Sequence, residues 1–183
     1  RALNRILPAV AAKQGQDSFK RQLLGRFIRS FQDRICQVRI SAVEALASLR
    51  DLSHHGVSSA PFFDVNWLIL NVGKRLGDVY LRMSYYVYRI TILQAFEQLA
   101  ADSSVLDDHV ETILIFLTGA LKDEVPNVRF AAVEALRTSS RFLDDSFVKR
   151  HIEPALRELE EAEVDLDVRS AIDNTLSSLC SYM

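Results

Sequence analysis

The sequence predicts an all-α protein, a right-handed solenoid in which antiparallel helix pairs repeat along one axis. The main observation is an internal repeat: residues 128–136 read VRFAAVEAL, and residues 38–46 read VRISAVEAL. A weaker copy begins at Val168, and Leu81-Arg82-Met83-Ser84 occupies the corresponding place between the two strong copies. The small apolar residues of this phrase recur at helical spacing, which indicates a buried helix face. A repeated helical unit of this kind indicates one array rather than several separate domains.

The period of the repeat indicates its class. Arg39, Arg82, Arg129 and Arg169 stand at the same place in the four copies and are 43, 47 and 40 residues apart. Intervals of this length are typical of the two-helix HEAT repeat. An acidic residue precedes each arginine, and in three of the four copies the separation is six residues.

This acid marks the expected corner of each repeat, the short turn between its first helix (helix A) and its second helix (helix B). We expect each acid to meet the arginine in the first turn of helix B and to tie the two helices together, because charge-assisted hydrogen bonds of arginine are strong. Such pairs would stack along the solenoid as a ladder. The expected ladder residues are Asp33, Arg39, Asp78, Arg82, Asp123, Arg129, Glu163 and Arg169.

With the corners at these positions, residues 1–183 are expected to form a single array. Residues 1–14 are expected to form the second helix of a truncated repeat, and 17–52, 61–102, 106–143 and 144–183 four complete repeats. In the second repeat, helix B is expected from about Val79 to Ala101. The chain begins inside a helix without the polar cap that terminal repeats need, which predicts a fragment from the C-terminal end of a longer array.

Composition favours a protein partner. Of the 183 residues, 49% are hydrophobic and the formal net charge is −2, which is ordinary for a globular chain and gives no field for nucleic acid or an anionic membrane. The two cysteines are too few for a disulfide framework and suit a reducing compartment. The sequence shows no signal peptide and no apolar run of the roughly 18 residues that a membrane span needs. We therefore expect a protein of the cytoplasm or the nucleus.

Nothing in the sequence predicts an enzyme, a cofactor or a metal site. His54 and His55 are adjacent in a predicted loop, and Cys36 and Cys180 have no neighbouring histidine. A catalytic site needs convergent groups, and a phosphate-binding loop needs clustered glycines. The six glycines are dispersed.

Two other binding functions were weighed. Arginines in the first complete repeat and a group of tyrosines could contact nucleic acid, but helix B carries mixed charges, as at Glu134, Arg137 and Arg141, rather than a basic stripe. A transport-receptor type of adaptor would show acidic inner helices along many repeats, and only the last corner is acidic.

With the repeats in phase, the sequence resembles the C-terminal HEAT repeats of the scaffold (A, regulatory) subunit of protein phosphatase type 2A. The resemblance covers the whole chain and rests on ordered segments: Asp78-Val79-Tyr80-Leu81-Arg82-Met83, Pro126-Asn127-Val128-Arg129-Phe130, Glu153-Pro154-Ala155-Leu156 and Val164-Asp165-Leu166-Asp167-Val168-Arg169. The corner at Asp78 is about two residues shorter than the family's.

The resemblance implies a non-catalytic scaffold and phosphatase regulator. The corners of the C-terminal repeats would bind the phosphatase catalytic subunit, and an exchangeable regulatory subunit would bind more N-terminal repeats. The positions that the resemblance gives for catalytic-subunit contacts are Arg34, Ile35, Cys36, Val79, Tyr80, Glu124, Val125, Asp165 and Leu166.

Overall fold

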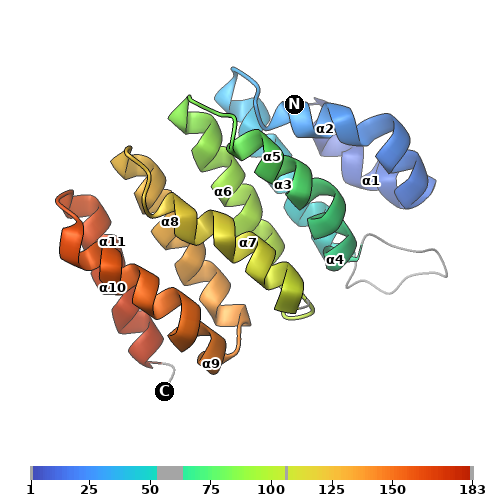
Figure 1. The fold of residues 1–183 in the computed structure, drawn as a ribbon. Helices are drawn as coiled ribbons and strands as arrows, with labels where there is room; N and C mark the ends of the chain where they lie inside the picture. The colour runs from blue at the N-terminus through green and yellow to red at the C-terminus, as the bar shows by residue number, and fades with distance from the viewer. Residues whose placement is uncertain (1, 53–63, 106, 182–183) are drawn as a thin grey trace.

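The protein is an all-α solenoid, as the sequence predicts. The computed structural model describes residues 2–52, 64–105 and 107–181, and all regular structure in these ranges is helical. The helices stack side by side in chain order, with the two termini at opposite ends of the array (Figure 1). No helix in the described ranges is long and apolar enough to cross a membrane.

Four layers follow an initial helix, and each contains a helix A and a helix B. Helices B are continuous: α3 (Cys36–Asp51), α6 (Tyr86–Ala100), α8 (Pro126–Ser139) and α11 (Leu166–Ser181). Helices A are more irregular. In the third layer helix A is α7 (Asp107–Ala120), and in the others a π-helical turn joins two segments. These segments are α4 (Val65–Leu68) and α5 (Lys74–Tyr80) in the second layer, α9 (Asp145–Phe147) and α10 (Glu153–Ala162) in the fourth.

The first layer begins inside a helix that runs on from the N-terminus. Helix α1 (Ala2–Ser18) contains a break at Gly15, whose φ of 77° lies in the left-handed region that favours glycine. The part before the break packs against α3, and the part after it continues through a π-helical turn (Phe19–Leu23) into α2 (Leu24–Ser30) as helix A of the first layer.

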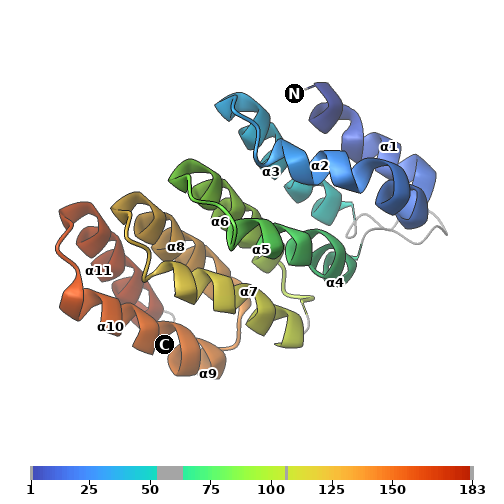
Figure 2. The ribbon, with the colours of Figure 1, turned by 45° about the horizontal axis from the view of Figure 1, so that its top comes forward.

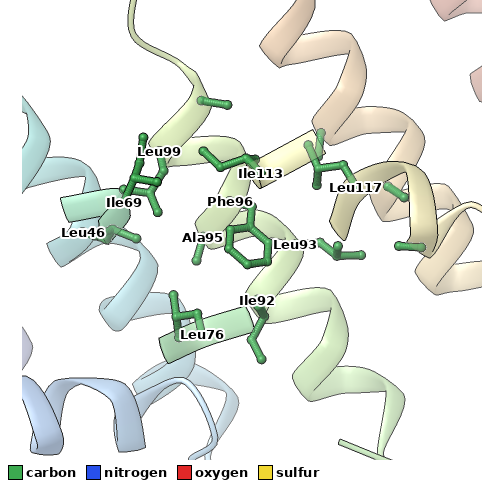
Figure 3. Close-up of a cluster of buried hydrophobic side chains, with 14 of the residues drawn as sticks. Leu46, Ile69, Leu76, Ile92, Leu93, Ala95, Phe96, Leu99, Ile113 and Leu117 are labelled. Atoms are coloured by element: carbon green, nitrogen blue, oxygen red, sulfur yellow. The ribbon is translucent and has the colours of Figure 1, made fainter. Parts of the chain in front are cut away.

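The core lies between the layers and is built mainly by helices B. Helix α6 packs on α3 and on α8, and α8 packs on α11. Alanines at 42, 45, 95, 132 and 135 are buried at these contacts, so that the helix axes can approach closely. Larger side chains complete the core, and Ile92, Leu93 and Phe96 of α6 lie in one buried cluster with Leu76 of α5 (Figure 3). The close packing of helices B on one another explains why the repeated phrase is rich in small residues.

The second repeat corrects one prediction. Its helix B begins at Tyr86 and not near Val79, because residues 74–80 are the last turns of helix A, with Leu76 and Val79 on its buried face. The predicted loop with His54 and His55 lies outside the described residues, as does the side chain of Cys180.

Candidate protein-binding edge

The four corners lie along one edge of the array. We call this edge the corner edge: the turns at residues 31–35, 81–85, 121–125 and 163–165, with the first residue of the helix B that follows each turn. Figure 2 shows these turns side by side, at the opposite ends of the helices from the connections between layers. The first three corners share one backbone geometry, because the residue before helix B is extended: φ and ψ are −82° and 115° at Ile35, −83° and 114° at Tyr85, and −92° and 117° at Val125. The corners are therefore equivalent, well-defined turns.

An acidic side chain closes the turn in three of the corners. The backbone N–H of Ile35 donates to Asp33 Oδ1 at 2.8 Å, and that of Val125 donates to Asp123 Oδ1 at 2.9 Å. In the fourth corner Glu163 Oε1 accepts from the backbone N–H groups of Val164 and Asp165 at 3.0 and 2.9 Å. These bonds satisfy backbone N–H donors that the start of a helix leaves without partners. The acid six residues before the arginine therefore stabilises the turn of its own corner.

In each of the first three layers one arginine, buried at 39 and 89 and half-buried at 129, binds the backbone of its own corner. Arg39 Nη1 donates to the carbonyl oxygens of Asp33 and Arg34 at 2.8 and 3.3 Å. Arg129 Nη1 makes the same two bonds to Asp123 and Glu124, at 2.9 and 3.3 Å. In the second layer this residue is Arg89, whose Nη1 donates to the carbonyl oxygens at 83 and 84 at 3.1 and 2.9 Å.

The prediction for the second ladder position is therefore wrong. Arg82 is exposed, and its Nε donates to the backbone oxygen of Asp78 at 2.8 Å, one turn back in the same helix end. The two side chains form no ladder pair, because Asp78 lies within α5 and Arg82 in the turn that follows it. The residue six positions before Arg89 is Met83, which is not an acid.

The carboxylates pair with arginines of the preceding layer rather than with their own. Arg89 Nη2 donates to Asp123 Oδ1 at 2.9 Å, and Arg89 Nε lies 2.9 Å from Oδ2. Arg129 Nε and Nη2 donate to the two oxygens of Glu163 at 2.6 and 2.7 Å. The predicted pairing of Asp123 and Glu163 with the arginines of their own repeats is therefore wrong, and the observed ion pairs tie the second layer to the third and the third to the fourth.

Burial makes these ion pairs structurally important. The side chains of Arg129 and Glu163 are 13% and 1% exposed, and those of Arg89 and Asp123 are each 10% exposed. The hydrogen bond from Arg129 holds the pKa of Glu163 below its ordinary value, and the same bond raises the pKa of Arg129. Arg169, in the last layer, is exposed and has no acidic partner among the described residues.

Large apolar side chains are exposed along the corner edge. The exposed fractions are 63% for Ile35, 75% for Leu81, 55% for Tyr85, 86% for Val164 and 80% for Leu166. Every corner except the third has at least one of them. Exposed apolar residues grouped on one edge are a feature of protein-binding surfaces.

The structure places most of the predicted contact residues on this edge. Arg34, Ile35 and Cys36 are exposed in the first corner and Glu124 in the third, while Val125 is half-buried against the core. In the fourth corner Asp165 is half-buried and Leu166 is exposed.

Val79 and Tyr80 are the exceptions, since both belong to α5. Val79 is buried, and Tyr80 is half-buried against Phe116, with ring centroids 6.1 Å apart. Burial, with a contribution from the charge of Asp123, raises the pKa of Tyr80 to about 12.

Sequence reasoning missed the residues that form the second corner. Tyr85 is the extended residue there, and its ring contacts those of Tyr86 and Tyr88, with centroids 5.6 and 5.3 Å away. The signal was available, because Arg89, Arg129 and Arg169 are 40 residues apart, so that counting back from the two later copies leads to Arg89.

Other surfaces of the described chain offer little chemistry. Groups of three or more histidine, cysteine or acidic residues that could hold a metal ion are absent from the described residues. A groove of about 560 Å³ lies between α7 and α10, lined mainly by Ile115, Gly119, Leu121, Ala155, Leu159 and Ala162. Its polar lining residues are bonded: Thr118 Oγ1 donates to the backbone oxygen of Leu114 at 2.6 Å, and Lys122 Nζ donates to Glu158 Oε1 at 2.9 Å.

The comparisons with known proteins agree with the fold. The HEAT repeat family matches residues 115–143, from the middle of α7 to the end of the third layer. The chain is therefore an all-α solenoid, and one stretch of it matches the HEAT repeat. A solved structure described as "Crystal structure of Cex1p" is similar, with a TM-score of 0.71 and 14% sequence identity over 98% of this chain and 32% of that one. The chain thus spans about a third of that protein's length, and at this identity the likeness concerns the fold alone. No curated protein sequence matches the chain.

Proposed function

We propose that this chain is a non-catalytic scaffold that binds a protein partner through its corner edge. The observation that carries the proposal is the row of exposed apolar residues at 35, 81, 85, 164 and 166, together with the closely similar backbone geometry of the first three corners. Bonded acids and arginines hold the corners in place, so a partner would meet preordered patches. Rigid patches bind with a smaller loss of conformational entropy than mobile loops do.

The partner that we propose is the catalytic subunit of a type 2A-like serine/threonine phosphatase. The support is the order of motifs at the corners, above all Pro126-Asn127-Val128-Arg129-Phe130 and Val164-Asp165-Leu166-Asp167-Val168-Arg169. An exchangeable regulatory subunit would bind to further repeats of the full-length scaffold. The setting would be the cytoplasm or the nucleus, where phosphatases and free thiols coexist.

The proposal predicts that charge introduced on the corner edge weakens this complex. Ile35→Glu and Leu166→Glu each place a carboxylate where an apolar contact is expected, and burying an unpaired charge at an interface is costly. We expect each variant to bind a purified type 2A catalytic subunit about tenfold or more weakly in surface plasmon resonance. The melting temperature should change little, since both side chains are exposed.

Leu70→Glu is the matched control. Leu70 is 55% exposed but lies in the middle of helix A of the second layer, away from the corners. Its substitution should leave the affinity unchanged. Equal losses in all three variants would refute the corner edge as the contact surface. A wild-type chain that does not bind the catalytic subunit would refute the phosphatase assignment and leave a HEAT-repeat adaptor for a different protein.

A further inference from the structure

Arg39 differs from the other buried arginines of the corners because the described residues give it no carboxylate partner. Its Nε donates to Thr91 Oγ1 at 3.2 Å, and its guanidinium lies over the ring of Tyr88, 5.5 Å from the centroid. The residue is only 8% exposed. A cation this far out of water is stabilised much better by a carboxylate than by a hydroxyl and a ring.

The atom that lacks its partner is Nη2. In the next two layers Nη2 of Arg89 and of Arg129 donates to a carboxylate of the following layer. Nη2 of Arg39 donates to none of the described residues. The first corner thus holds one charge-assisted donor without a partner among the described residues, next to the exposed residues Arg34 and Ile35.

Met83 occupies the position that supplies the carboxylate in the next two layers. It stands six residues before Arg89, where Asp123 and Glu163 stand before Arg129 and Arg169. A methionine thioether is a weak acceptor and carries no charge. Its side chain is unbranched and flexible, which allows it to move aside for another group.

The surroundings favour an anion carried by a protein. Arg34 is exposed beside Arg39, and the carboxylate of Asp33 is already engaged by the N–H of Ile35. Exposed Ile35 and Tyr85 flank the position from the two adjacent corners. A ligand here would therefore meet positive charge between two apolar contacts, on the surface that we assign to the partner.

We propose that Arg39 Nη2 binds the carboxylate of an aspartate or glutamate side chain of the protein that docks on the corner edge. The partner would thereby supply the acid that Met83 does not, and would complete the ladder between the first and second layers. A carboxylate fits because the array makes the same pairing twice within itself. This inference rests on the proposed function, since it names one contact of the same surface.

A first experiment supplies the carboxylate from within the chain. In Met83→Asp the new carboxylate can accept from the backbone N–H of Tyr85 and form an ion pair with Arg39. The uncharged amide of Met83→Asn can accept from the same N–H but cannot form the ion pair. We expect Met83→Asp to melt about 2–4 °C above Met83→Asn at pH 7, and the difference to disappear in an Arg39→Gln background. Equal melting temperatures of the two variants would overturn the proposal, because Arg39 would then have no open position for a carboxylate.

A second experiment tests a carboxylate from outside. N-acetylglutamate, titrated into ¹⁵N-labelled protein, should shift the Arg39 guanidinium resonance in the wild type and in Met83→Asn but not in Met83→Asp. No shift in the wild type would contradict the proposal.

The affinity for a purified type 2A catalytic subunit should be about tenfold lower for Met83→Asp than for Met83→Asn. Equal affinities would show that the partner supplies no carboxylate there. If the wild type does not bind this subunit, the phosphatase assignment fails, and the titration still decides whether Arg39 is a carboxylate site.

Discussion

The contribution of an individual ion pair to the stability of the protein depends on its burial. Arg129 and Glu163 join two layers through two short hydrogen bonds and are almost fully enclosed. Lys122 and Glu158 join the same two layers at 2.9 Å, but they are 72% and 68% exposed. Exposed pairs contribute about 0–1 kcal/mol, whereas removing one member of a buried pair costs about 3–5 kcal/mol because the other charge stays buried.

The buried pair predicts a specific pH dependence. The hydrogen bond from Arg129 keeps the pKa of Glu163 in the folded protein below the ordinary value of a glutamate. Its contribution to stability is therefore present above that value and is lost as the pH falls through the folded pKa. Glu163→Gln should lower the free energy of unfolding by about 2–4 kcal/mol at pH 7 and flatten its decline at acidic pH, measured by urea denaturation at several pH values.

Glu158→Gln is the control for this prediction, with an expected change within about 0.5 kcal/mol at pH 7. An unchanged stability of Glu163→Gln would show that the buried pair does not hold the third and fourth layers together.

At the scale of the helices, one glycine sets how closely two helices A approach. A Cβ built on Gly77 of α5 would lie 2.5 Å from Cζ of the Phe116 ring in α7, so this ring would have to move. Phe116 also stacks on Phe96, with centroids 5.0 Å apart, so the ring is held from both sides. The second and third layers are thus packed around this ring.

Gly77→Ala should therefore destabilise the protein although alanine is the better helix former. Overpacking destabilises a protein by about 1–3 kcal/mol, which exceeds the ~1 kcal/mol that the higher helix propensity of alanine contributes. Gly25→Ala is the matched control, since a Cβ there meets nothing within 4 Å, and it should be stabilising by up to about 1 kcal/mol. Thermal melts of both variants test the prediction. A neutral Gly77→Ala would mean that α5 and α7 can separate at little cost.

The sequence pattern predicts the positions of three of the four helices B. Small residues at helical spacing located helices B of the first, third and fourth layers, because the packing of helices B requires them. The second layer was misplaced because Leu81-Arg82-Met83-Ser84 imitates the repeated phrase, while the true copy at Arg89 lacks the upstream acid. The interval from Arg39 to Arg89 is 50 residues and not 40, since the segment around residues 53–63 lengthens it.

The pairing of carboxylates across layers could not be read from the sequence either. The spacing of six residues is the same whether an acid contacts its own arginine or that of the preceding layer. Only the stacking of the corners decides between them. For the same reason the exposed tyrosine of the second corner and the open position at Arg39 became visible only in three dimensions.

At the scale of the whole molecule, the corner edge both reinforces the stacking of the layers and presents the surface that we assign to the partner. Each layer contacts mainly its neighbours, so the stability of a solenoid is carried by the interfaces between layers. The corner edge holds the ion pairs that reinforce two of these interfaces, and it also presents the exposed apolar residues. A partner that spans the corners would therefore bind the protein and fix the relative positions of its layers.

The most direct test of this account is hydrogen–deuterium exchange of the chain, with and without a purified type 2A catalytic subunit. The account predicts slower exchange on binding at residues 31–36, 81–86, 121–126 and 163–167, which form the corners and the starts of helices B. Exchange at residues 101–105 and 143–146, between the layers, should be unchanged. Protection confined to these connections, or to the outer faces of helices A, would contradict the corner edge as the binding surface.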